Sequence, residues 1–158
     1  VITAFTSLGL QFLTDSRREV SSSEVIEIIG PSGVRDVGAW LRANTRTTDL
    51  IATNYELSET SFGYEGYPLA AWSHREFLVL GFPTPETRST QEKWIRANRA
   101  VKEFATGANH EGCQTLLNFG VKWFVADLEQ TSNRYWPQCA TVEFSTDRFI
   151  VLSLASAN

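Results

Sequence analysis

The sequence predicts a three-layer α/β domain, in which helices pack on a mixed, mostly parallel sheet that ends in an antiparallel hairpin. Short apolar runs alternate with segments of helical periodicity, an order typical of parallel strands joined by crossover helices. The run 121–126 is almost entirely apolar, as a strand covered on both faces would be. The runs 140–144 and 149–154 are separated only by residues 145–148, which favours a β-hairpin.

The first part of the chain predicts an N-terminal segment followed by the start of the domain. The opening residues are apolar at roughly helical spacing and lead into a polar stretch. We therefore assign residues 1–23 to an apolar segment and linker, and residues 24–158 to a single α/β domain. A short strand is predicted at 25–29. Ser32 is then a suitable N-cap for an amphipathic helix over 33–43.

The middle of the domain predicts two further strands and three helices. Residues 50–53 form an apolar run that indicates a buried strand. Pro68 suits the first turn of a short helix ahead of a strand over 77–80. In the long helix that follows, Ser89 and Glu92 have the spacing of a capping box. The inward-facing residues predicted for this helix and for the short helix after it are Trp94, Ala97, Val101, Phe104, Cys113, Leu116 and Leu117.

Length, composition and charge are those of one soluble globular domain. The chain has 158 residues, of which 42% are hydrophobic and 20% charged, so a disordered chain is excluded. The net charge of −4 argues against nucleic acid as a partner, because nucleic-acid binders usually carry a basic excess. No run reaches the roughly 20 apolar residues that a membrane-spanning helix needs.

The two cysteines, Cys113 and Cys139, are predicted to meet at one edge of the sheet. A helix between parallel strands runs antiparallel to them, so the start of the helix with Cys113 lies near the carboxyl edge. If the strand after Cys139 turns back, it begins at that same edge. A disulfide is then geometrically reasonable and would fit an oxidising compartment. Two buried free thiols are the alternative.

Several segments of the chain resemble the C-terminal soluble domain of polytopic bacterial membrane proteins of the GT-C glycosyltransferase type. The resemblance covers roughly residues 36–154 and lies in fold-type patterns rather than in catalytic signatures. It includes a tryptophan–leucine–arginine helix, an arginine just before the second strand, and a leucine pair that leads into a glycine–valine strand ending in aspartate. The segments that carry it are 38–45, 49–54, 71–75, 77–81 and 116–127, with Trp136 and the closing hairpin.

This resemblance implies a bacterial cell-envelope domain on the extracytoplasmic face of the membrane. Its partner would be the transmembrane part of the same parent protein. In proteins of that type the catalytic acidic residues lie in loops of the membrane part, so we expect no catalytic residue in this chain. The domain would help to bind a sugar or a lipid-linked substrate.

Candidate ligand-binding residues follow the strand at 50–53. Asn54 ends that strand, and α/β sheets bind ligands at the carboxyl edge of their strands. The loop after it carries aromatic residues between glycines, and Tyr64, Glu65 and Tyr67 would suit a sugar ring or a lipid-linked substrate. The alternative is that these aromatic side chains pack the loop onto the domain.

Arg75 and Asp127 complete the candidate substrate-binding set. Arg75 lies just before a predicted strand, where the resembling proteins also carry an arginine. It is expected to pair with an acidic group such as Asp127, or to bind a substrate phosphate.

Two other function classes stay open. The turn at residues 30–33 follows a predicted strand and precedes a helix, the context of a phosphate-binding loop. A stand-alone α/β enzyme or nucleotide-binding module is therefore one alternative, and a protein-interaction domain is the other. We expect no cofactor and no metal, since His110 and Cys113 alone make a weak zinc signal.

Overall fold

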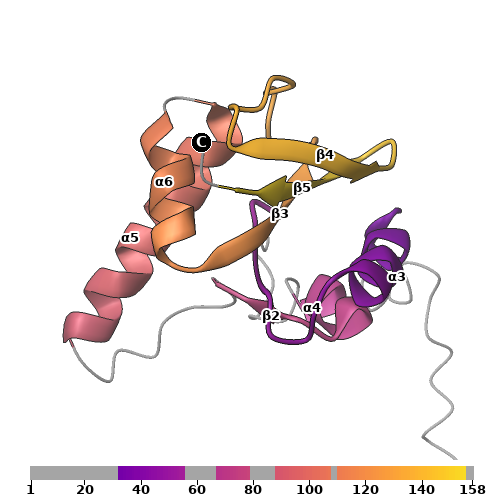
Figure 1. Ribbon diagram of the computed structural model, residues 1–158, viewed down its shortest axis with the longest axis horizontal. Helices are drawn as coiled ribbons and strands as arrows, with labels where there is room; N and C mark the ends of the chain where they lie inside the picture. Colours follow the sequence, from indigo (N-terminus) through magenta and orange to yellow (C-terminus); the bar gives the residue numbers. More distant parts are fainter. Residues whose placement is uncertain (1–31, 56–66, 79–87, 108–109, 156–158) are drawn as a thin grey trace, which may run out of the picture.

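The computed structural model describes four stretches of the chain: residues 32–55, 67–78, 88–107 and 110–155. The elements follow in the order α3 (Val34–Asn44), β1 (Leu50–Thr53), α4 (Tyr67–Ser73), β2 (Glu76–Phe77), α5 (Arg88–Thr106), α6 (His110–Asn118), β3 (Val121–Asp127), β4 (Ala140–Ser145) and β5 (Phe149–Leu154) (Figure 1). The predicted segment 1–23 and the predicted strand 25–29 lie outside these residues. The described elements confirm the α/β class.

The five strands form one mixed sheet in the order β2-β1-β3-β5-β4. β1 pairs in parallel with both β2 and β3, whereas β5 pairs antiparallel with both β3 and β4. The expectation of a mostly parallel sheet is thus met only in part. The hairpin is confirmed, but its second strand, β5, lies between β3 and β4, and both of its pairings are antiparallel.

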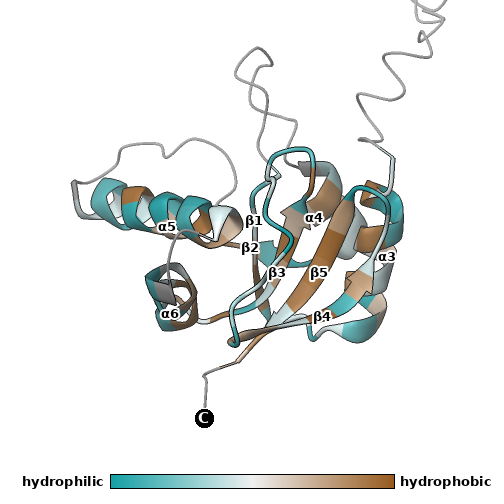
Figure 2. Cartoon of the chain, turned by 90° about the horizontal axis from the view of Figure 1, so that it is seen from above, coloured by the Kyte–Doolittle hydropathy of each residue, from teal (hydrophilic) through white to brown (hydrophobic). Residues whose placement is uncertain are grey.

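Helices cover both faces of the sheet, which makes three layers (Figures 1 and 2). α5 and α6 pack on one face, where Phe104 and Leu116 meet Phe124 and Leu152 in one buried cluster. α3 and α4 pack on the other face, over a second cluster of the residues Val37, Leu41, Leu69, Ile51, Val125 and Val151. From Trp123 to Ala126, successive residues of β3 alternate between the two clusters, so this part of the strand is covered on both faces, as its apolar sequence predicts.

The start of α3 differs from the prediction by one residue. Gly33, not Ser32, is the N-cap, with a φ of 89° and no side-chain hydrogen bond to the helix. Glycine adopts this positive φ without strain. A Cβ at this position would lie 3.1 Å from Thr146 Oγ1. Gly33 therefore allows the first turn of α3 to lie close against the turn between β4 and β5.

Two further boundaries differ from the prediction. α5 already begins at Arg88, so Ser89 and Glu92 lie within the helix and do not form its capping box. β2 is described over Glu76–Phe77, and Leu78 continues the contact by donating its N–H to the carbonyl oxygen of Ile51 at 2.8 Å. Residues 79–80 of the predicted strand lie outside the described residues. A two-residue strand lies at the edge of a sheet, where it needs a partner on one side only.

An aromatic cluster joins α3 to the sheet, and one of its tryptophans is hydrogen-bonded to the Asp49 carboxylate. Trp40 stacks on Phe144 at 5.6 Å between ring centroids and meets Trp123 edge-on at 5.7 Å. Asp49 Oδ2 accepts hydrogen bonds from Trp123 Nε1 at 3.1 Å and from the Arg46 N–H at 3.0 Å. Burial alone would raise the pKa of Asp49, but these two hydrogen bonds and neighbouring positive charge lower it below 3.8.

The predicted disulfide is confirmed. Cys113 in α6 is bonded to Cys139, which lies just before β4, at a sequence separation of 26. The bond ties the α6 layer to the outer part of the sheet. Within the described stretches, no helix is both long and apolar enough to cross a membrane.

Candidate functional site

The carboxyl ends of β1 and β3 meet at one edge of the sheet, as predicted for Asn54 and Asp127. The side chain of Asn54 binds the backbone of Asp127 at both polar groups. Its Oδ1 accepts from the Asp127 N–H at 2.7 Å, and its Nδ2 donates to the Asp127 carbonyl oxygen at 3.2 Å. Both residues are buried. Asn54 therefore acts as a clamp that holds the end of β3 beside β1.

Arg148 is the partner of the buried Asp127 carboxylate. Its Nε and Nη2 donate to the two carboxylate oxygens at 3.0 and 2.7 Å, which is a bidentate pair. Its third nitrogen, Nη1, lies 2.6 Å from Glu129 Oε2. The guanidinium also lies over the rings of Tyr55 and Phe149, at 5.7 and 5.2 Å from their centroids. Four residues from the ends of three strands, β1, β3 and β5, thus converge on one arginine.

This environment keeps Arg148 positively charged. Burial alone would lower the pKa of Arg148, but hydrogen bonds to Asp127 and its charge, followed by the charge of Glu129, raise that pKa above its usual value. Asp127 is 0% exposed, so its carboxylate also needs the positive partner to remain in the protein interior. The ion pair between Arg148 and Asp127 is therefore a structural feature of the carboxyl edge of the sheet.

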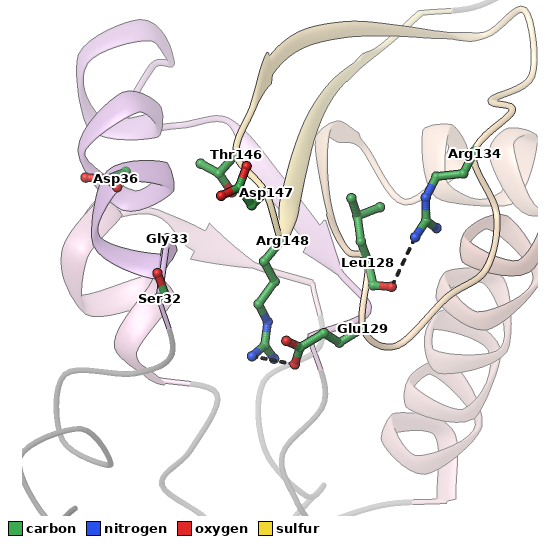
Figure 3. A pocket seen from close by; sticks show the side chains of 9 residues that line it. All are labelled: Ser32, Gly33, Asp36, Leu128, Glu129, Arg134, Thr146, Asp147 and Arg148. Carbon is green, nitrogen blue, oxygen red and sulfur yellow. Dashed lines mark hydrogen bonds and ion pairs between the residues drawn. The ribbon is translucent and has the colours of Figure 1, made fainter.

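A pocket of about 450 Å³ opens beside this pair (Figure 3). It lies between the start of α3, the turn after β3, and the turn between β4 and β5. Five of its lining side chains are ionisable: Asp36, Glu129, Arg134, Asp147 and Arg148. The remaining lining residues are Ser32, Gly33, Leu128 and Thr146. The pocket has the size and position expected of a small-molecule site in an α/β fold.

Arg134 holds one wall of this pocket. Its Nη1 donates to the carbonyl oxygens of Thr131 and Asn133 at 2.8 and 2.9 Å, and its Nη2 reaches toward the carbonyl oxygen of Leu128 at 3.5 Å (Figure 3). Thr131 Oγ1 in turn donates to the Ala105 carbonyl oxygen of α5 at 2.7 Å. The loop after β3 is therefore tied to itself and to α5.

One other predicted site residue, Arg75, is not brought to this pocket. Arg75 lies at the opposite edge of the sheet and does not pair with Asp127. It donates five hydrogen bonds there, to carbonyl oxygens of Arg42, Thr45, Ser73 and His74 and to the Thr45 hydroxyl. These bonds cap the C-terminal ends of α3 and α4, because they satisfy carbonyl oxygens that have no hydrogen-bond partner within the helices.

Most of the predicted aromatic loop lies outside the residues that the structure describes. Tyr64 and Glu65 lie outside the described residues, and only the backbone of Tyr67 is described, as the first residue of α4. Their proposed contact with a ligand therefore stays a prediction.

Three residues of the site, Arg148, Glu129 and Arg134, were not predicted from the sequence. A usable signal existed for Arg148, because it immediately precedes the second strand of the predicted hairpin. Because β5 pairs antiparallel with β3, Phe149 lies opposite Asp127. Arg148, the residue just before Phe149, therefore lies at the same edge of the sheet. The hairpin alone did not reveal this pairing, since it leaves the neighbour of β3 undecided.

Comparison with known proteins finds no family model that matches this chain and no curated protein that matches it. In the described part of the chain, no group of three or more histidine, cysteine or acidic side chains is placed to hold a metal ion.

Proposed function

We propose that this chain is an extracytoplasmic accessory domain of a membrane glycosyltransferase-like protein. Its role is to help bind a sugar or a lipid-linked substrate, while catalysis takes place in the membrane part of the same parent protein. The observation that carries the proposal is the disulfide between Cys113 and Cys139. Disulfides persist in oxidising compartments and are rare in the cytosol, which favours the extracytoplasmic side of a membrane.

The pocket supports the binding part of the proposal. It lies at the carboxyl edge of the sheet, and its main charged groups are committed to one another through Arg148, Asp127 and Glu129. A carboxylate held in a bidentate pair is poorly placed to accept a proton from a substrate, because it would first have to release its partner. Such a network suits the wall of a binding site better than a catalytic centre.

The compartment is tested by trapping thiols in the source cells. Cells that produce the natural parent protein are quenched in acid, denatured, and treated with a maleimide of about 5 kDa that adds visible mass to each free thiol. We expect reduction to add two more maleimide groups than are attached before it, one each for Cys113 and Cys139. A variant with Cys113→Ser and Cys139→Ser serves as the control, in which this gain of two on reduction should be lost.

Membrane attachment is tested in the same cells. The parent protein should stay with the membrane pellet after alkaline carbonate extraction, and protease added outside spheroplasts should digest this domain. If both cysteines are modified without reduction, or the domain resists external protease while the membrane is intact, the extracytoplasmic assignment is wrong. A stand-alone cytosolic α/β protein would then be the better interpretation.

A further inference from the structure

The charges around the pocket decide which class of ligand it admits. Three carboxylates, Asp36, Glu129 and Asp147, line it together with the guanidinium groups of Arg134 and Arg148. These groups sum to a formal charge of −1, and the buried Asp127 behind Arg148 adds one more negative charge. An anionic ligand would enter against this charge, since like charges at close range disfavour each other.

Most of the arginine donors at the pocket are already in use. Arginine binds phosphate best through two parallel N–H bonds. In Arg148 the Nε and Nη2 donors face Asp127, and Nη1 faces Glu129. The Nη1 of Arg134 donates to two backbone carbonyl oxygens, and its Nη2 lies 3.5 Å from a third. A phosphate could take over the Arg148 pair only by leaving the Asp127 carboxylate buried without its partner.

Hydrogen-bond acceptors, in contrast, are available at the mouth of the pocket. Asp36 and Asp147 are exposed, and neither makes a hydrogen bond or ion pair with another residue of the described part. Figure 3 draws Asp147 in the turn that leads to Arg148, and Asp36 on the helix α3. Carboxylates accept up to two hydrogen bonds per oxygen and suit ligands rich in hydroxyl groups.

We propose that this pocket binds an uncharged sugar unit through its hydroxyl groups and excludes phosphate. The inference rests on the proposed function and names the part of a lipid-linked substrate that would enter: the sugar, with the phosphate left outside. The Arg148–Asp127 pair is then the rigid floor of the site, and Asp36 and Asp147 are the groups that bind hydroxyls.

The test compares matched ligands by amide chemical shifts of the ¹⁵N-labelled protein. Glucose, mannose and galactose are each titrated to about 50 mM beside the corresponding 6-phosphate. We expect at least one neutral sugar to give saturable shifts at Gly33, Glu129 and Thr146. Its 6-phosphate should bind at least about tenfold more weakly.

Paired variants separate the role of the pocket carboxylates from a change in net charge. The double variant Asp36→Asn with Asp147→Asn should bind the neutral sugar about fivefold or more weakly and should bind the sugar phosphate more tightly. Glu111→Gln with Glu76→Gln changes net charge by the same amount away from the pocket, and Glu111, like Asp36, lies in the first turn of its helix. This control should leave both affinities within about twofold of the original.

Two results would overturn the inference. One is binding of a sugar phosphate as tight as that of its neutral sugar, and the other is the lack of saturable shifts with all three neutral sugars. Neither result would touch the compartment, because thiol trapping in cells reports the location of the domain independently.

Discussion

Asp127→Asn removes the charge that balances Arg148 and keeps nearly the same side-chain shape. Asp127 is fully buried, and the side chain of Arg148 is 19% exposed. Removing one partner of a buried ion pair costs about 3–5 kcal/mol, because the other charge is left without compensation. Arg148 would still contact Glu129 at 2.6 Å and some water, so we expect a loss at the lower end, about 3 kcal/mol.

The assay is urea unfolding followed by circular dichroism, with Glu129→Gln as the matched control. Glu129 is 64% exposed, so loss of its contact with Arg148 should change the free energy of unfolding by only about 0–1 kcal/mol. Domains are stable by about 5–15 kcal/mol in total. The loss of stability in Asp127→Asn should therefore appear as a clearly lower urea concentration at the unfolding midpoint. The dependence of the unfolding free energy on urea concentration should stay the same.

A double-mutant cycle with Arg148→Met decides whether the pair itself is responsible. Removing both charges leaves neither group buried alone, so the double variant should lose less stability than the sum of the two single variants, by about 1–3 kcal/mol. Strict additivity would refute the reasoning. So would a loss in Asp127→Asn that is no larger than that in Glu129→Gln.

Three further changes test other parts of the fold. Replacing Cys113 and Cys139 with alanine should lower the unfolding free energy by about 3.5 kcal/mol in the chain-entropy model, and an unchanged urea midpoint would contradict it. Since the pKa of Asp49 is lowered below 3.8 in the folded protein, the stability it contributes is present at higher pH and lost as pH falls through that lowered value. In the Asp49→Asn variant the free energy of unfolding should therefore fall less steeply as the pH drops below about 5. An equally steep fall would show that Asp49 does not contribute to this pH dependence. Gly38→Ala should destabilise the protein by about 1–3 kcal/mol, because the new methyl group would meet the Cβ of Trp72 and lie 3.1 Å from the Trp72 carbonyl carbon. A melting temperature equal to that of the unchanged protein would show that α3 and α4 can move apart at no cost.

Most of the layers of this fold could be predicted from local pattern. The apolar run of β3 required cover on both faces, and the two helical pairs provide it. The disulfide followed from the direction of α6 relative to the strands, since that direction places Cys113 near the edge where the strand after Cys139 begins. These features depend on neighbouring segments only.

The site could not be predicted as well, because it depends on strand order. Asn54 and Asp127 were placed at one edge correctly, since both end parallel strands. Arg75 was expected to pair with Asp127, but it precedes β2 and so lies at the other edge, where carbonyl groups occupy it. Arg148 reaches Asp127 only because β5 lies next to β3, and two strands of a hairpin can enter a sheet in either order.

The position of β5 also governs when the domain can assemble as the chain is synthesised from its N-terminus. β4 reaches the sheet through β5 alone, so it has no place to pair until residues 149–154 have emerged. Cys113 and Cys139 both emerge earlier, and their oxidation need not wait for the last strand. A covalent link formed at that stage shortens the search of the final strand. A chain that stalls before Phe149 would hold an open sheet, in which Arg148 is present but lacks the β3–β5 pairing that places it beside Asp127.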